Sequence, residues 1–242
     1  MGSKPGVLVL FDLDQTLVDA IPIYDKACRK VFAELFGVKC SAYDLDFAGK
    51  TLPAIIWEGC QRNGVSRKTY NAKLSIAISR LSSYFNDYLS DSKSKIRVLT
   101  GVKLLLEALS KKGIPMGIVT GSAECNAKRL LAKAGLSGHF LFVIGGERAR
   151  DKRQGIALAK KDTKRLLGAK PARIIFVGDS PREAEIALDE GIEFIGTATG
   201  FHTKAQLSAA GAKKAFSNLS KTNALLNSIL STSKGPKRKR NA

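Results

Sequence analysis

The sequence predicts an α/β protein with a doubly wound, Rossmann-like parallel sheet as its core and an inserted all-α helical cap. Two observations predict the core: short apolar runs without polar alternation are typical of strands buried on both faces, and helical segments alternate with them. A third observation predicts the cap, because roughly 75 residues after the first apolar run have helical periodicity and no further buried strand.

Five apolar runs are expected to form the strands of the core. Each is rich in Val, Ile, Leu or Phe, which suits a strand that is covered by helices on both sides. In chain order they are Val7–Phe11, Ile114–Thr120, Phe140–Ile144, Ile174–Val177 and Phe194–Gly196.

Helices are expected between and after these strands. Ser122 is a plausible N-cap of the second helix, Pro181 occupies the first position of the third, and glycines follow the ends of the first three. The predicted helices are Val102–Leu109, Ala123–Ala134, Pro181–Glu190 and Asn223–Leu230.

The cap is predicted over residues 19–97, which leaves residues 1–18 and 98–233 for the core. Apolar residues recur at helical spacing from Tyr24 to Leu35 and again from Leu74 to Tyr88. Trp57, the single tryptophan, is interpreted as part of the cap's own core rather than as a platform for a ligand.

The chain is strongly basic. Its 242 residues carry 40 Lys and Arg against 21 Asp and Glu, a net charge of +19. Such a charge favours phosphate groups and polyanions as partners, but the cations are spread along the chain, so nucleic acid is expected only as a weak electrostatic contact. Residues 234–242 are predicted to be a disordered basic tail, either a simple solvated tail or a nuclear import signal.

Cysteine usage and apolar run lengths indicate the compartment. The four cysteines show no C-x-x-C spacing, which favours reduced thiols in a cytosol-like compartment. The first apolar run is too short for a signal peptide or a membrane span. We therefore expect a cytoplasmic protein without a membrane partner; the oligomeric state stays open.

The strongest chemical signal is Asp12-Leu13-Asp14-Gln15-Thr16, directly after the first strand. Ligands bind at the carboxyl ends of strands in open parallel sheets. Two carboxylates there repel each other unless a cation is present, and Mg²⁺ prefers such oxygen ligands. The alternative is a turn that caps the next helix.

Further polar residues follow later strands in an ordered way. Thr120, Gly121 and Ser122 end the second strand, where a hydroxyl and a helix N-terminus suit a phosphate oxygen. Asp179 follows a later strand, with Glu183 one turn on. An N-cap role for Ser122 and a turn role for Asp179 are the plain alternatives, but their succession at strand ends favours one shared site.

These motifs together resemble the haloacid dehalogenase-like hydrolase superfamily, in its phosphatase branch with a helical cap, and most of all its phosphoglycolate phosphatase-like members. The likeness spans roughly residues 7–230 and includes Gly49-Lys50-Thr51 in the cap. It implies an Mg²⁺-dependent phosphomonoester hydrolase that acts through an aspartyl-phosphate on a small phosphorylated substrate, with phosphoglycolate as the leading candidate.

The resemblance also implies a role for each site residue. Asp12 would be the nucleophile, Asp14 the general acid and base, Thr120 a ligand of the phosphoryl group, and Lys152 its charge partner. The implied metal ligands are Asp12, the main-chain carbonyl of Asp14, and Asp179, while Glu183 would bind the metal through water or pair with the lysine. Gly121, Ser122 and Lys50 are candidate substrate-binding residues, although Lys50 suits a solvated helix start equally well.

Departures from the family pattern leave alternatives open. Gln15 stands where the family usually has Gly, and Asp151-Lys152-Arg153 replaces Gly-Lys-Pro, so Arg153 or Lys160 could take the role of Lys152. An acid at position 14 favours phosphate esters over halides, as known from the family. A sugar-phosphate mutase, and a nucleic-acid-associated protein or polynucleotide-end phosphatase, are the competing functions.

Overall fold

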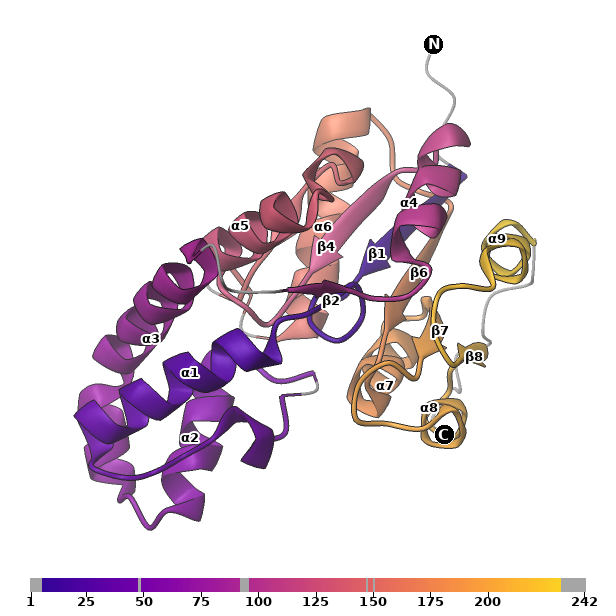
Figure 1. The fold of residues 1–242 in the computed structure, drawn as a ribbon. Coiled ribbons are helices and arrows are strands. Elements are labelled where there is room, and N and C mark those ends of the chain that lie inside the picture. The colour runs from indigo at the N-terminus through magenta and orange to yellow at the C-terminus, as the bar shows by residue number, and fades with distance from the viewer. Residues whose placement is uncertain (1–5, 48, 92–95, 147, 150, 232–242) are drawn as a thin grey trace.

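A computed structural model describes residues 6–47, 49–91, 96–146, 148–149 and 151–231. It contains a six-stranded sheet covered by helices on both faces, with a group of helices projecting to one side as a cap (Figure 1). The predicted fold class, an α/β core with a helical cap, is therefore confirmed.

The sheet is parallel throughout, and its order places the first strand in the middle. The strands run β5-β4-β1-β6-β7-β8, so the chain moves outward from β1 and then returns to its other side at β6. Such a reversal opens a crevice at the carboxyl ends of the central strands. The strands are β1 (Val7–Phe11), β4 (Met116–Val119), β5 (Val143–Ile144), β6 (Arg173–Gly178), β7 (Glu193–Thr197) and β8 (Lys214–Phe216).

Two hydrophobic cores flank the sheet because successive side chains of a strand point to opposite faces. Val9 and Phe11 belong to one cluster, whereas Leu8 and Leu10 belong to the other. The first cluster includes residues of α4 (Val102–Lys111), α5 (Glu124–Ala134) and α9 (Thr222–Leu230), and the second includes residues of α6 (Lys152–Leu167), α7 (Pro181–Asp189) and α8 (Lys204–Ala209).

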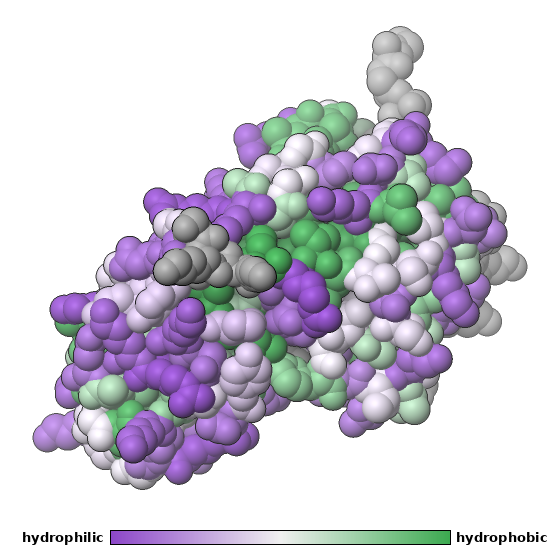
Figure 2. Space-filling model, in the orientation of Figure 1, coloured by the Kyte–Doolittle hydropathy of each residue, from purple (hydrophilic) through white to green (hydrophobic). Residues whose placement is uncertain are grey.

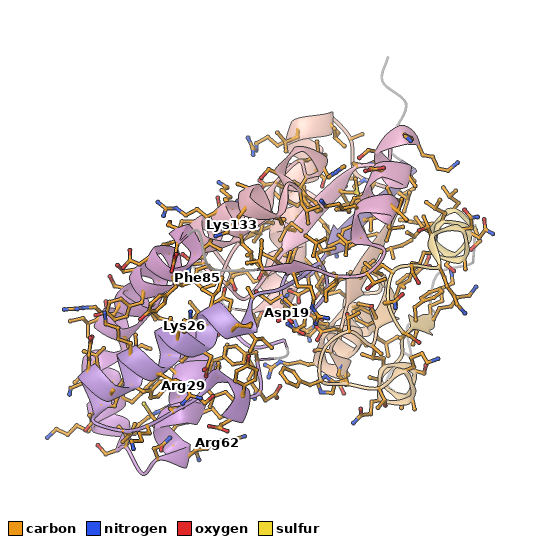
Figure 3. The ribbon with its side chains drawn as sticks, in the orientation of Figure 1. Asp19, Lys26, Arg29, Arg62, Phe85 and Lys133 are labelled. Carbon is orange, nitrogen blue, oxygen red and sulfur yellow. The ribbon has the colours of Figure 1, made fainter. Side chains whose placement is uncertain are left out.

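The cap consists of α1 (Ile21–Val31), α2 (Leu52–Arg62) and α3 (Arg67–Ser90). A π-helical turn, Phe32–Phe36, continues α1, and a 3₁₀ turn, Ala42–Asp44, precedes α2. The two predicted apolar faces are confirmed, since their residues are buried or pack against the first core cluster. Phe85 of α3, which is labelled in Figure 3, stacks on Tyr24 of α1 at a ring-centroid distance of 4.3 Å.

The chain leaves and re-enters the core through a short antiparallel pair that the sequence did not reveal. β2 (Val18–Asp19) pairs with β3 (Arg97–Val98), and an ion pair of 3.0 Å joins Asp19 to Arg97. Figure 3 labels Asp19 at this junction between cap and core. Two-residue strands are too short for a periodic signal, which explains why they were missed. The domain boundaries at these residues stay a prediction.

Other differences concern the ends of elements and elements that were not predicted, among them the helices α6 and α8. The predicted strand Phe140–Ile144 shortens to β5 because Phe140 follows a 3₁₀ turn, Ser137–His139, and Leu141 is half exposed. β8 was not predicted: it is a short edge strand that begins with a lysine, and edge strands typically lack a continuous apolar run.

Hydrophilic residues cover most of the face in Figure 2, in keeping with the net charge, and apolar residues gather near its centre. Among the described helices, none combines the length and apolarity that a membrane crossing requires. The predicted basic tail, residues 234–242, and its import-signal alternative lie outside the described residues.

Gly101 offers a test of the packing between α4 and the C-terminal segment. Its φ is +88°, and an added Cβ would lie 2.1 Å from the main-chain carbon of Leu219. We expect Gly101→Ala to lower the free energy of unfolding by roughly 2–5 kcal/mol, the sum of left-handed strain and overpacking. Urea denaturation measures this.

Gly135→Ala is the matched control. Gly135 has φ +69° but open space around its Cα, so only the strain of about 1–2 kcal/mol is expected. Equal losses in the two variants would contradict the close approach of the main chains at Gly101.

Candidate active site

Three central strands deliver polar side chains to one cavity between the sheet and the cap. Asp12 follows β1, Thr120 follows β4 and Asp179 follows β6, and all three are at least nine-tenths buried. Every predicted site residue except Glu183 lines this cavity: Asp12, Asp14, Lys50, Thr120, Gly121, Ser122, Lys152 and Asp179. The sequence prediction of one shared site at the strand ends therefore agrees with the geometry.

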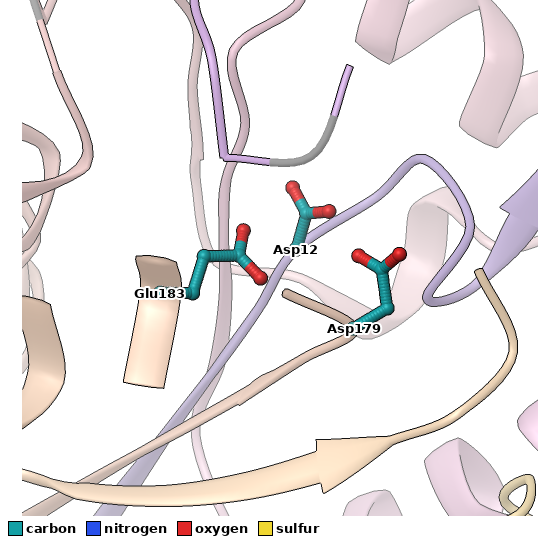
Figure 4. A group of neighbouring side chains, drawn as sticks. All are labelled: Asp12, Asp179 and Glu183. Carbon is teal, nitrogen blue, oxygen red and sulfur yellow. The ribbon is translucent and has the colours of Figure 1, made fainter. Parts of the chain in front are cut away.

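Three acids converge at the centre of the site. Asp12, Asp179 and Glu183 each offer a carboxylate oxygen, and these oxygens lie within 4.8 Å of one another (Figure 4). Glu183 comes from the first turn of α7, where Ser180 caps the helix by accepting a hydrogen bond from the Glu183 N–H at 3.2 Å. Hard cations with oxygen ligands suit such a group.

Lys152 supplies a positive charge to this cluster. It is the first residue of α6, whose N-cap is Asp151, and its ammonium donates to Asp12 Oδ1 and to the carbonyl of Val119 at 2.7 Å. It also lies 2.9 Å from Glu183 Oε1. The sequence left open whether Glu183 contacts a lysine or serves a metal; in the structure it contacts Lys152 and also belongs to the acidic cluster.

The two alternative cations lie elsewhere. Arg153 pairs with Asp189 at 2.7 Å and with Glu190 at 3.3 Å, and Lys160 pairs with Glu190 at 3.4 Å. Adjacent helical positions point about 100° apart, so only one residue of the pair 152 and 153 can face the sheet. Lys152 is the one that reaches the cavity.

Burial and mutual repulsion raise the proton affinity of the acids. Burial, and then the charge of Asp12, raise the pKa of Asp14 to about 7. Burial also raises the pKa of Glu183 to about 7, against the opposing effect of Lys152, and it raises the pKa of Asp179 well above its usual value. These buried acids therefore bind a proton more readily than exposed carboxyl groups do.

Asp14 is linked to the cap by a chain of two hydrogen bonds. The Ser122 hydroxyl donates to Asp14 Oδ2 at 2.7 Å. Because this bond uses the single proton of Ser122, the Tyr24 hydroxyl is the donor in the second bond, to Ser122 Oγ at 2.7 Å. The expected N-cap role of Ser122 is wrong: α5 begins at Glu124, and its N-cap position is Ala123. Sequence analysis missed Tyr24, since its helical spacing marked it only as a core residue.

The cap lies directly on the core at Gly121. An added Cβ there would be 2.2 Å from the carbonyl oxygen of Lys50, so only glycine permits this approach. The Lys50 ammonium lies 2.8 Å from Asp46 and 2.8 Å from Glu58, both residues of the cap. Burial lowers the pKa of Lys50, but the hydrogen bonds that its ammonium donates to the two carboxylates outweigh this effect and raise the pKa.

Gln15 keeps the backbone conformation that glycine would adopt. Its φ is +61°, in the left-handed region. Hydrogen bonds hold it there: its N–H donates to the carbonyl of Val18 at 2.8 Å, its carbonyl accepts from the Thr199 hydroxyl at 2.6 Å, and its side-chain amide donates to Asp19 at 2.8 Å. At this position, where the resemblance expects glycine, the chain thus has a left-handed backbone conformation with a larger residue.

The fold and the site together indicate a hydrolase class. Its features are an acidic centre bound to a lysine, at the strand ends of a parallel sheet, and an inserted helical cap over that centre. A model of the family described as haloacid dehalogenase-like hydrolase matches residues 9–197, which is most of the chain. The chain belongs to this family.

Curated relatives narrow the activity. The chain is 26% identical over 206 residues to a phosphoglycolate phosphatase of Pseudomonas putida, covering 83% of this chain and 72% of that one. It is 28% identical over 197 residues to a phosphoglycolate phosphatase of Rhodospirillum rubrum, covering 80% of each. The protein is accordingly a phosphatase of this family.

A solved structure supports the fold. The crystal structure of a predicted phosphoglycolate phosphatase from Haemophilus somnus has a TM-score of 0.73, with 18% identity over 90% of this chain and 97% of that one. At this identity the likeness concerns the fold alone.

Lys152 and its neighbour allow a test of the buried charge balance. We expect Lys152→Met to lower the free energy of unfolding by about 3–5 kcal/mol without added metal, because it leaves the buried acids without their cation. Arg153→Met, which removes only exposed ion pairs, is expected to cost about 0–1 kcal/mol. Urea denaturation at neutral pH in a chelator compares them, and equal losses would show that Lys152 is not the charge partner of the cluster.

Proposed function

We propose that the protein is an Mg²⁺-dependent phosphomonoester hydrolase that acts through an aspartyl-phosphate on a small phosphorylated metabolite. The observation that carries this proposal is the convergence of Asp12, Asp14, Asp179 and Lys152 on one cavity. Phosphoglycolate is the first substrate to test, because the curated relatives bear its name. The free cysteines support a cytosol-like compartment.

The donor set fits Mg²⁺. Three buried carboxyl groups offer oxygens within 4.8 Å of one another. Burial, and then the charges of Glu183 and Asp12, raise the pKa of Asp179, and a bound cation would oppose this effect. Asp12 and Asp179, with the main-chain carbonyl of Asp14, would hold the ion. Glu183 is fully buried and is not one of the described residues that line the cavity. This position supports a role as the partner of Lys152. When bound, Mg²⁺ neutralises phosphoryl oxygens and orients them.

The first chemical step transfers the phosphoryl group to Asp12. Its carboxylate attacks phosphorus, the bond to the ester oxygen breaks, and Asp14 gives its proton to the leaving alcohol. A pKa near 7 suits this task, because a useful fraction of Asp14 then carries a proton at neutral pH. Lys152 and the Thr120 hydroxyl stabilise the charge on the phosphoryl oxygens.

The second step regenerates the enzyme. Asp14, now a carboxylate, takes a proton from water; the water oxygen attacks phosphorus, and the bond to Asp12 breaks to release phosphate. The hydrogen bond from Ser122 holds Asp14 in place for both transfers. The cap packs onto Gly121 beside the cavity, which excludes bulk water and favours a small substrate over a polymer.

Asp12→Asn tests the nucleophile. We expect phosphate release to fall by at least about a thousandfold, because an amide oxygen is a poor nucleophile and Asn supplies no charge to a metal. Circular dichroism should remain unchanged, since Asn preserves the size of the side chain. Asp189→Asn, a surface change, is the control. Turnover within tenfold of the wild-type value, that is a loss of less than about 1.4 kcal/mol in transition-state stabilisation, would rule out this role.

Asp179→Asn tests the metal site with two readouts. We expect added Mg²⁺ to raise the melting temperature of the wild type, because a ligand that binds only the folded state stabilises it. In Asp179→Asn the shift should shrink, and the Mg²⁺ concentration for half-maximal activity should rise by at least about tenfold. Full turnover in a chelator, or an unchanged thermal shift in the variant, would contradict this site.

A further inference from the structure

The side of the cavity that faces the cap is apolar. Residues of α1, α2 and the intervening segment contribute most of it, and a residue of the loop after β7 lies at its edge with 52% of its surface exposed. The apolar lining comprises Ile21, Tyr24, Phe47, Leu52, Ile55 and Phe201. In a phosphatase whose Asp12 attacks the phosphorus, the leaving alcohol points away from Asp12, toward the cap. The leaving group therefore meets hydrocarbon.

The hydroxyl of Tyr24 does not make this side of the cavity polar. Its hydroxyl donates to Ser122, and its ring stacks on Phe85. The stacked ring and the fixed hydroxyl hold the tyrosine in one orientation. It therefore contributes mainly hydrocarbon to the leaving-group side of the cavity.

The cations of the lining are already paired. Among the described residues that line the cavity, the charged donors are Lys50 and Lys152. Lys152 is bound by Asp12 and Glu183. Lys50 is bound by Asp46 and Glu58, so a carboxylate on the substrate would have to displace one of these acids.

We infer that the site selects phosphomonoesters whose alcohol portion is uncharged and apolar, and that it discriminates against alcohols that carry a carboxylate. This inference rests on the proposed phosphatase function and concerns its substrate class. A buried carboxylate without a cation is costly, whereas a hydrocarbon group gains from contact with the apolar lining. Phosphoglycolate carries such a carboxylate and is therefore expected to be a poor substrate.

The test compares two esters of the same shape. Isobutyl phosphate and 2-phosphoglycolate both carry a methylene group followed by a carbon with two terminal atoms, and they differ in charge. We expect kcat/KM with Mg²⁺ to be at least about tenfold higher for isobutyl phosphate, measured by phosphate release. A kcat/KM for 2-phosphoglycolate that equals or exceeds this value would overturn the inference and leave the phosphatase function intact.

Glu58→Gln tests the reason for the selectivity. The change removes one of the two charges that hold Lys50, so kcat/KM for 2-phosphoglycolate relative to isobutyl phosphate should rise by about threefold or more. Glu34→Gln is the control, because Glu34 lies on the cap surface and contacts Tyr84 and Arg80. An unchanged ratio in Glu58→Gln would overturn the role assigned to the pairing of Lys50.

A third substrate distinguishes a failure of the proposed phosphatase function from a failure of the inferred preference for apolar alcohols. p-Nitrophenyl phosphate has an activated leaving group and reports phosphatase chemistry with little demand on the cap. If the wild type hydrolyses none of the three esters with Mg²⁺, the proposed function fails, and this inference fails with it. Hydrolysis with a preference for 2-phosphoglycolate that Lys50→Met abolishes would instead show that Lys50 binds the substrate carboxylate.

Discussion

Packing several carboxylates into a buried space is the constraint on which the rest of this structure depends. Parallel strands bring Asp12 and Asp179 to one edge of the sheet, and α7 adds Glu183. Burial makes each of these charges costly, and each raises the cost of the others. Lys152 offsets part of that cost from the first turn of α6. The remaining imbalance is useful to a phosphatase, because it is removed when a cation binds.

The cap completes the site from the other side. It reaches the core through the short pair β2 and β3, and the Lys50 carbonyl lies against Gly121. Tyr24 connects the cap to Asp14, since its hydroxyl is hydrogen-bonded to Ser122, which in turn is hydrogen-bonded to Asp14. A cap that moved away would break this chain of hydrogen bonds. Contact between the cap and the core and the orientation of Asp14, the proposed general acid, are thus coupled in one network.

The sequence revealed the core of the site because its signals are local. An apolar run followed by acids or hydroxyls indicates a strand end, and parallel strand ends meet in space. It did not reveal Tyr24, whose hydroxyl meets Ser122 across 98 residues of sequence, nor the pairing of Lys50 with Glu58. Short elements were also missed: β2, β3 and β8 contain two or three residues each, fewer than a periodic pattern needs. Long-range polar contacts leave no periodic trace, so only the folded chain shows them.

The two halves of the cavity carry different information about function. The core half contains the groups that are proposed to handle phosphate, and it is this half, with the fold, that links the chain to phosphatases. In the proposed function the cap half meets the leaving alcohol, and the apolar character of this half follows from side chains such as Phe47 and Ile55 and from the paired state of Lys50. A relative with 26% identity is more readily similar to this chain in the residues of the core half than in those of the cap half. Differential binding of the leaving group, rather than phosphate chemistry, therefore sets the substrate in such an enzyme.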